Sequence, residues 1–314
     1  MRRVLQSLIL SCLFVVLGTG AVRADVLPAF NRTRDVIYGR KAGLALTMDV
    51  FAPRAKTNGK GILFVVSGGW FSRPELIHPE MYSVLLERGY TVFAVVHGTQ
   101  PKFTIPEILE DLHRAVRFVR YHARDYQIDP DHLGITGGSA GGHLSLMMGM
   151  AGDKGDPRAK DPVDRVSSRV QAVACFFPPT DFLNWGRSGY TLDMAHMRRP
   201  FTAAVDFKEY DREKALYVPI TDEKKVKDIL RRISPIAHVT SDDAPTLIIH
   251  GDKDHLVPLQ QSEIMVAKLK EAGVPAKLIV KKDCDHGWIT MVKDTQTFAD
   301  WFDQYLKEKP KTSE

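Results

Sequence analysis

Short apolar runs alternate along this chain with longer segments that have the periodicity of amphipathic helices. The first run alternates apolar and polar residues like a half-buried strand, and the later ones are mostly continuous, as in strands buried on both faces. The runs are Leu44–Phe51, Ile62–Val66, Thr91–Val96, His132–Ile135, Val170–Phe176, Thr246–His250 and Ala276–Val280. They predict the strands of one central sheet.

The segments between these runs predict helices. The clearest is Ile105–Tyr126, where Thr104 precedes Glu107 by three residues, the spacing of a capping box. Pro258–Ala272 and Met291–Tyr305 are further amphipathic candidates. Strands that alternate with helices predict an α/β fold, with a mostly parallel sheet and helices on both faces.

One segment interrupts the alternation, from about residue 178 to 239. It carries many charges and several aromatic residues, has no convincing strand, and includes a helical run at Glu223–Arg232. Insertions of this length often fold over a functional site. We expect a cap here, inserted into a single domain that spans residues 25–314.

The N-terminus has the features of a signal peptide. Arg2 and Arg3 precede an apolar stretch from Leu8 to Val22, and Ala24 marks a cleavage point. The alternatives are an uncleaved anchor, or a lipoprotein through Cys12, which lies within the apolar stretch. We expect residues 1–24 to be removed, no stable membrane insertion afterwards, and a periplasmic or extracellular protein.

Removal of that segment changes the charge of the chain. The net charge is +5, residues 1–24 contain three arginines and no acidic residue, and 5 − 3 leaves +2. This balance does not indicate a nucleic-acid partner. The two remaining cysteines, Cys175 and Cys284, are expected on strands separated by another strand, too far apart for a disulfide. We expect buried free thiols.

The strongest chemical signal is the run Ile135–His143, which contains Gly137-Gly138-Ser139-Ala140-Gly141. It is a G-x-S-x-G motif between a short strand and the apolar helical stretch Leu144–Met150. A serine on so sharp a turn needs glycine neighbours, and the following helix N-terminus favours a developing anion. No Lys-Ser or Lys-Thr follows, which excludes a phosphate-binding P-loop. Ser139 is the predicted nucleophile.

An acidic loop follows the strand that ends at His250. Loops at the carboxyl ends of parallel strands commonly hold catalytic groups. Asp254 lies deeper in this loop than Asp252, just before the next helix, and is the favoured partner of a catalytic histidine. Asp252 remains the alternative, with a turn-forming role as its structural explanation.

A histidine after the last strand completes the order Ser, Asp, His. His286 lies in Asp283-Cys284-Asp285-His286-Gly287-Trp288 and is the predicted general base. The other histidines near the motifs have structural interpretations: His143 packs at a helix start, His250 forms hydrogen bonds at a strand end, and His255 is solvated.

The loop after Val66 reads Ser67-Gly68-Gly69-Trp70. Its glycines allow the backbone N–H groups of Gly69 and Trp70 to face the site, where they would form an oxyanion hole with the N–H of Ala140. The alternative is a plain Gly-Gly turn. No cluster of histidines and cysteines has metal-ligand spacing, so we expect neither a metal nor another cofactor.

Together these residues resemble the esterase branch of the α/β-hydrolases. The similarity is closest to the bacterial feruloyl- and acetyl-esterase-like group, related to hormone-sensitive lipase and prolyl oligopeptidases. It rests on Ile62–Trp70, on Ile108–His143 with its Ile128-Asp129-Pro130, and on Ser234–Pro258 and Asp283–Trp288. The resemblance assigns the triad to Ser139, Asp254 and His286. One departure is Ser67, where the family's oxyanion loop usually begins with histidine.

The resemblance implies hydrolysis of short-chain or aromatic acyl esters, free or linked to polysaccharide, through an acyl-enzyme. One alternative is a peptidase or amidase of the prolyl-oligopeptidase type, and another is a catalytically silent binding protein. A haloalkane dehalogenase is excluded because its chemistry needs aspartate at the position of Ser139.

Overall fold

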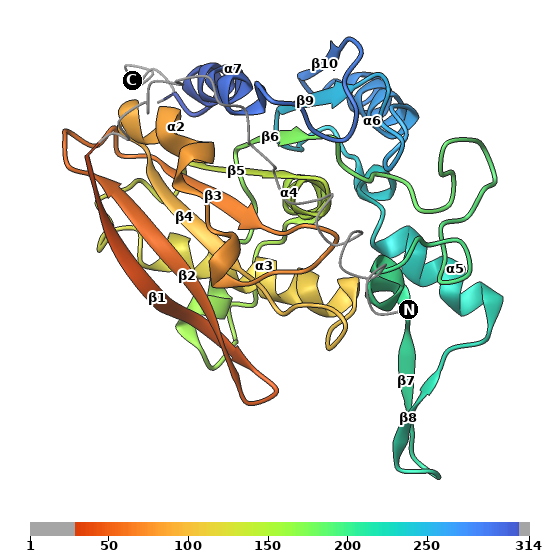
Figure 1. Cartoon of the computed structure of the whole chain (residues 1–314). Coiled ribbons are helices and arrows are strands. Elements are labelled where there is room, and N and C mark those ends of the chain that lie inside the picture. Colours follow the sequence, from red (N-terminus) through yellow and green to blue (C-terminus); the bar gives the residue numbers. More distant parts are fainter. Residues whose placement is uncertain (1–28, 308–314) are drawn as a thin grey trace, which may run out of the picture.

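A computed structural model describes residues 29–307 of the chain (Figure 1). The expected signal peptide, residues 1–24, lies outside this range, so the expectation of export stays a prediction. Within the described range, no helix is both long and apolar enough to cross a bilayer.

Eight strands form one sheet in the spatial order β1-β2-β4-β3-β5-β6-β9-β10. β2 pairs antiparallel with β1 and β4, and the remaining neighbours pair parallel. The strands of this sheet are β1 (Phe30–Lys41), β2 (Leu44–Pro53), β3 (Gly61–Val66), β4 (Thr91–Val96), β5 (Leu133–Gly138), β6 (Ala172–Phe176), β9 (Thr246–Gly251) and β10 (Ala276–Lys281). The predicted mostly parallel sheet is confirmed, and every predicted run overlaps one of its strands, although β5 begins after His132 and β6 after Val170.

Helices cover both faces of the sheet, as Figure 1 shows. Side chains of α3, α4 and α6 share one apolar core with alternate strand positions such as Val65 and Val95. The intervening positions, such as Val66 and Val96, face a second core with α2 and α7. The helices are α2 (Ser83–Glu87), α3 (Ile105–Tyr121), α4 (Ala140–Ala151), α5 (Glu223–Arg232), α6 (Gln260–Glu271) and α7 (Met291–Tyr305).

The structure corrects three expectations about secondary structure. α3 ends at Tyr121 instead of Tyr126, because the chain tightens there into turns with i→i+3 bonds as it reverses toward β5. The segment 178–239, hereafter the cap, contains a two-stranded hairpin where no strand was expected, β7 (Lys208–Asp211) with β8 (Leu216–Pro219). β1 was not predicted either. β1 and β7 carry exposed, charged residues and β8 is only four residues long, so none of them shows the pattern of a buried strand.

The two cysteines behave differently from one another. Both are free, as expected, and β9 separates β6 from β10. Cys175 is fully buried on β6, but Cys284 lies in the loop after β10 and is only half-buried. The expectation of two buried thiols is wrong for Cys284, because β10 ends at Lys281 before reaching it.

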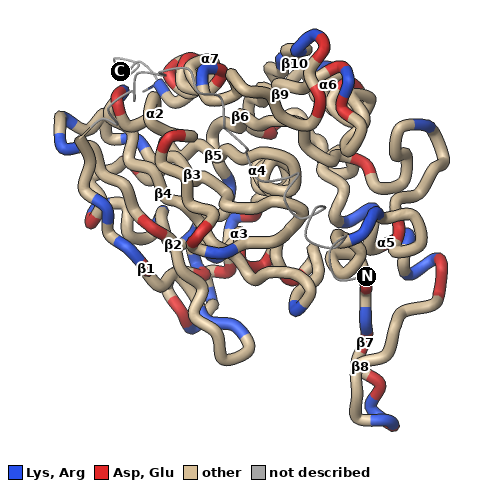
Figure 2. Tube along the Cα trace, in the orientation of Figure 1, with Lys and Arg blue, Asp and Glu red and all other residues tan. Residues whose placement is uncertain are grey.

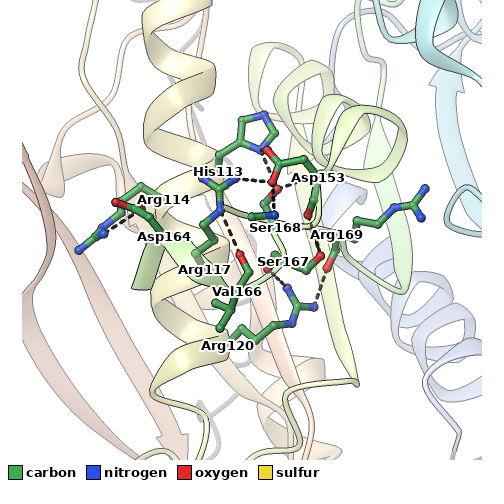
Figure 3. A network of polar contacts seen from close by, with 11 residues as sticks. His113, Arg114, Arg117, Arg120, Asp153, Asp164, Val166, Ser167, Ser168 and Arg169 are labelled. Carbon is green, nitrogen blue, oxygen red and sulfur yellow. Dashed lines mark hydrogen bonds and ion pairs between the residues drawn. The ribbon is translucent and has the colours of Figure 1, made fainter. Parts of the chain in front are cut away.

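Charges of both signs are interspersed on β1 and around the hairpin β7–β8 (Figure 2). On α3, arginines three residues apart bind the loop that follows α4, and Figure 3 shows this network. Arg117 binds Asp153 and the carbonyl of Val166, and Arg120 donates to the carbonyls of Ser167 and Arg169. These contacts fix the loop between α4, the helix that begins directly after Ser139, and β6, the strand that pairs with β5.

Candidate active site

Ser139 lies on the turn between β5 and α4, in a backbone conformation that L-residues rarely adopt (φ 54°, ψ −119°). Such a conformation costs on the order of 1–3 kcal/mol and needs support from its surroundings. A Cβ on Gly137 would come within 2.6 Å of the Gly141 carbonyl carbon, and one on Gly141 within 2.7 Å of the Val65 oxygen. Glycine at both positions is therefore required for strand, turn and helix to approach this closely.

The structure brings Ser139, His286 and Asp254 into one hydrogen-bonded series. His286 follows β10 and Asp254 follows β9. The Ser139 Oγ and the His286 Nε2 are 2.9 Å apart, and the His286 Nδ1 lies 2.7 Å from the Asp254 Oδ2. An ionised Asp254 accepts the Nδ1 proton, which leaves Nε2 free to accept a proton from the serine hydroxyl.

Asp254 is held as a carboxylate. Burial of its side chain raises the pKa, but hydrogen bonds with His250 and His286 outweigh burial and hold the pKa well below its usual range. The other carboxylate oxygen accepts the backbone N–H groups of Leu256 and Val257, both at 2.8 Å. These contacts fix the orientation of the group that faces His286.

The neighbouring candidates take other positions. Asp252 is exposed, and the geometry brings Asp254 rather than Asp252 to His286. His250 is buried at the end of β9, with Nδ1 2.6 Å from the Ser262 Oγ and Nε2 2.9 Å from the Val257 carbonyl. His255 is exposed beside Asp285, with 3.1 Å between the side chains. The structural interpretations of both histidines agree with these contacts.

The loop after β3 forms a tight turn beside Ser139. Gly68 and Phe71 exchange two backbone hydrogen bonds of 3.0 Å, and the residues between them, Gly69 and Trp70, both have positive φ (55° and 62°). Within residues 29–307, the N–H groups of Gly69, Trp70 and Ala140 donate to no protein acceptor. They are the three groups that the sequence analysis assigned to an oxyanion hole. With no acceptor in this part of the chain, each of these N–H groups is free to donate to a negatively charged oxygen.

His143 connects this turn to the cap. Its imidazole is fully buried; Nδ1 accepts the Trp70 indole N–H at 3.2 Å, and Nε2 donates to the Ile233 carbonyl at 2.7 Å. Burial lowers the pKa of His143 to about 4, although the bond to Ile233 acts in the opposite direction. The sequence interpretation of His143 as a packing residue agrees with these contacts but did not include the link to Trp70.

Sequence reasoning missed Phe177, the residue directly after β6. Its ring packs against the His286 imidazole, with 4.3 Å between the ring centroids. Its place at the carboxyl end of a strand next to β5 and β9 was a signal that it faces the site. In the described part of the chain, no three His, Cys, Asp or Glu side chains converge as metal ligands would.

The chain resembles known esterases in sequence. The BD-FAE family model matches residues 48–269. The probable carboxylic ester hydrolase LipM of Mycobacterium tuberculosis is 30% identical over 76% of this chain and 52% of its own length. Esterase LipQ of the same organism is 29% identical over 77% of this chain and 53% of its own length. The chain thus spans about half the length of these two relatives.

Solved structures share the fold. A truncated carbohydrate esterase from gut microbiota has a TM-score of 0.71 and 26% identity, over 91% of this chain and 99% of the other. The thermophilic esterase Est2 of Thermogutta terrifontis has a TM-score of 0.68 and 21% identity, over 92% of this chain and 96% of its own. The second likeness concerns the fold alone.

Proposed function

Because the chain belongs to the BD-FAE family, we propose that it is a serine hydrolase that cleaves carboxylic esters through an acyl-enzyme. The observation that carries the proposal is the series Ser139–His286–Asp254, with distances of 2.9 and 2.7 Å in the order that nucleophilic catalysis requires. The esterase relatives support the same reaction class.

In the first half-reaction, the Ser139 oxygen attacks the ester carbonyl while its proton passes to Nε2 of His286. The carbonyl oxygen gains negative charge and accepts hydrogen bonds from the N–H groups of Gly69, Trp70 and Ala140. His286 then gives its proton to the departing alcohol. Asp254 keeps the imidazole in the required tautomer and stabilises the transient imidazolium.

In the second half-reaction, water replaces the alcohol. His286 accepts a proton from the water as the water oxygen attacks the acyl-serine, and the same N–H groups stabilise the second oxyanion. Collapse of that intermediate returns the proton to Ser139 and releases the carboxylic acid. The reaction balances with water as the only co-reactant and needs no cofactor.

The substrates we propose are short-chain or aromatic acyl esters, including acyl groups on carbohydrate. The support is the resemblance to a carbohydrate esterase, at 26% identity over nearly all of that chain. Export, if the N-terminal segment acts as a signal peptide, would bring the enzyme to such esters outside the cytoplasm.

Hydrolysis of a p-nitrophenyl ester series from acetate to octanoate tests the proposal, with Ser139→Ala as the comparison. We expect turnover that is greatest on short chains and falls by about a million-fold in the variant. A folded wild type that hydrolyses p-nitroanilides but not esters would favour an amidase. A folded wild type that neither turns over substrate nor reacts with a fluorophosphonate would refute a catalytic role.

A further inference from the structure

We propose that Gln100, in the loop after β4, is the positioning residue that keeps the Trp70 N–H directed at the reacting oxygen. The proposal rests on the function proposed above and deepens it. Gln100 is 1% exposed, and its side-chain Nε2 donates to the carbonyl of Gly69 at 2.5 Å. Its backbone N–H donates to the carbonyl of Trp70 at 3.2 Å. One residue therefore binds both central carbonyls of the turn.

The geometry of the peptide bond converts this contact into an orientation. The Gly69 carbonyl and the Trp70 N–H belong to the same planar trans peptide, so they point in opposite directions. In the sheet order β4-β3-β5, the turn after β3 lies between Gln100, which follows β4, and Ser139, which follows β5. A Gly69 carbonyl held toward Gln100 consequently directs the Trp70 N–H toward the side of Ser139.

The turn has a competing conformation that Gln100 opposes. Positive φ at both central residues is the combination found in type I′ turns, whereas a type II′ turn requires it only at the first. Rotation of the Gly69–Trp70 peptide by about half a turn would relieve Trp70, whose positive φ costs roughly 1–2 kcal/mol. It would also reverse the Trp70 N–H. That rotation breaks the bond from Gln100 to Gly69, so the bond holds the turn in its less favourable state.

The side-chain amide has one workable orientation. Its Nε2 faces a carbonyl oxygen, so an exchange of Oε1 and Nε2 would place two acceptors against each other. Among the described residues, Gln100 Oε1 is buried without a hydrogen-bond partner. A buried polar atom without a partner is rarely tolerated unless the residue has another role. Here that role is the hydrogen bond that the Nε2 of the same amide donates to the Gly69 carbonyl.

The docking of the two loops does not depend on the Gln100 side chain. The backbone N–H of Ser72 donates to the Thr99 Oγ1 at 3.1 Å, and the N–H of His97 donates to the Ser72 Oγ at 3.1 Å. A change at Gln100 therefore leaves the loops in contact and removes only the bond that orients the peptide. Thr99 offers the matched control, because it ties the same loops together without touching the Gly69 carbonyl.

The test compares Gln100→Met with Thr99→Val. Methionine has a similar length but no donor, and the backbone bond to Trp70 is retained. Loss of one oxyanion donor lowers kcat by about 10²–10³, and a peptide that is only released to rotate should lower it by about 10- to 100-fold. We expect that loss in Q100M with KM changed less than about twofold. The inhibition constant of a boronic acid, which forms a tetrahedral adduct on serine, should rise in parallel with the loss of kcat.

T99V should lower the melting temperature and leave kcat close to that of the wild type. Q100M with unchanged kcat, or with kcat, KM and melting temperature altered together as in T99V, overturns the role of Gln100. If Q100M does not fold, Gln100→Asn takes its place, because its shorter amide cannot reach Gly69. A wild type without ester turnover or fluorophosphonate labelling refutes the proposed function itself, and this role falls with it.

Discussion

His143 should make the protein lose stability in mild acid. It lies in the first turn of α4, is fully buried, and binds the Trp70 indole N–H through Nδ1. A protonated imidazole would present a second donor to that N–H and would carry an unsolvated charge. Both effects favour the neutral form, and burial holds the pKa of His143 at about 4 in the folded protein.

The size of the effect follows from the two pKa values. An imidazole whose pKa is lower in the folded than in the unfolded state binds fewer protons when folded. Its stabilising contribution is therefore complete above about pH 6.5 and is lost as the pH falls toward 4. At pH 5 the unfolded imidazole, with a pKa of about 6.5, gains about 2 kcal/mol from protonation, at about 1.4 kcal/mol per pH unit. The folded imidazole, with a pKa of about 4, is almost fully unprotonated at pH 5 and gains almost no free energy from protonation.

The assay is urea unfolding at pH 7 and pH 5 for the wild type and His143→Gln. Glutamine offers an acceptor and a donor but does not titrate. Between pH 7 and pH 5, the free energy of unfolding should therefore fall by about 2 kcal/mol more in the wild type than in H143Q. Burial also lowers the pKa of His97 to about 4. Its effect on the free energy of unfolding is the same in both proteins and cancels in the comparison. Replacement of the exposed His78 by glutamine is the control. Equal losses in wild type and H143Q would refute the buried neutral imidazole.

Two further predictions concern the triad and the arginine network. Asp254→Asn should lower kcat about 10⁴-fold, because its amide N–H faces an imidazole N–H, while Asp252→Asn should retain activity in the same ester assay. Arg120→Ala should lower the free energy of unfolding by about 3 kcal/mol, since it leaves backbone carbonyls without their donor. The exposed Arg158→Ala should change it by less than about 0.5 kcal/mol in urea titrations.

Much of the fold could be predicted because a buried strand or helix face appears in the sequence as a local pattern of apolar residues. The strand Thr91–Val96 is covered on both faces, so all of its positions after Thr91 are apolar and the run is visible in the sequence. The Ser139 turn is also visible in the sequence, because close backbone contacts exclude side chains at Gly137 and Gly141 and so require glycine on both sides of the serine. Ser139, Asp254 and His286 each follow a strand of the parallel part of the sheet, β5, β9 and β10. Because the carboxyl ends of parallel strands lie at the same edge, their positions in the sequence were enough to predict that they meet.

The features that escaped prediction depend on contacts between distant segments. β7 and β8 are four residues long and pair with each other in solvent, so they leave no buried apolar run in the sequence. Gln100 is a polar residue in a loop, and only the fold reveals that it meets the carbonyl of Gly69, 31 residues earlier. Phe177 is one of several aromatic residues near strand ends, and its contact with His286 is equally non-local.

The cap is structurally joined to the turn Gly68–Phe71 that follows β3. The Phe201 ring covers Gly69 so closely that a Cβ there would lie 2.2 Å from the ring. The Trp70 ring packs on Phe182 at 6.0 Å between centroids, and His143 ties Trp70 to the Ile233 carbonyl. Gln100 holds the same turn from the side of β4. The turn is thus fixed between the sheet and the cap. If its N–H groups bind the oxyanion as proposed, a change that displaces the cap should alter kcat through Gly69 and Trp70 as well as KM through substrate contacts.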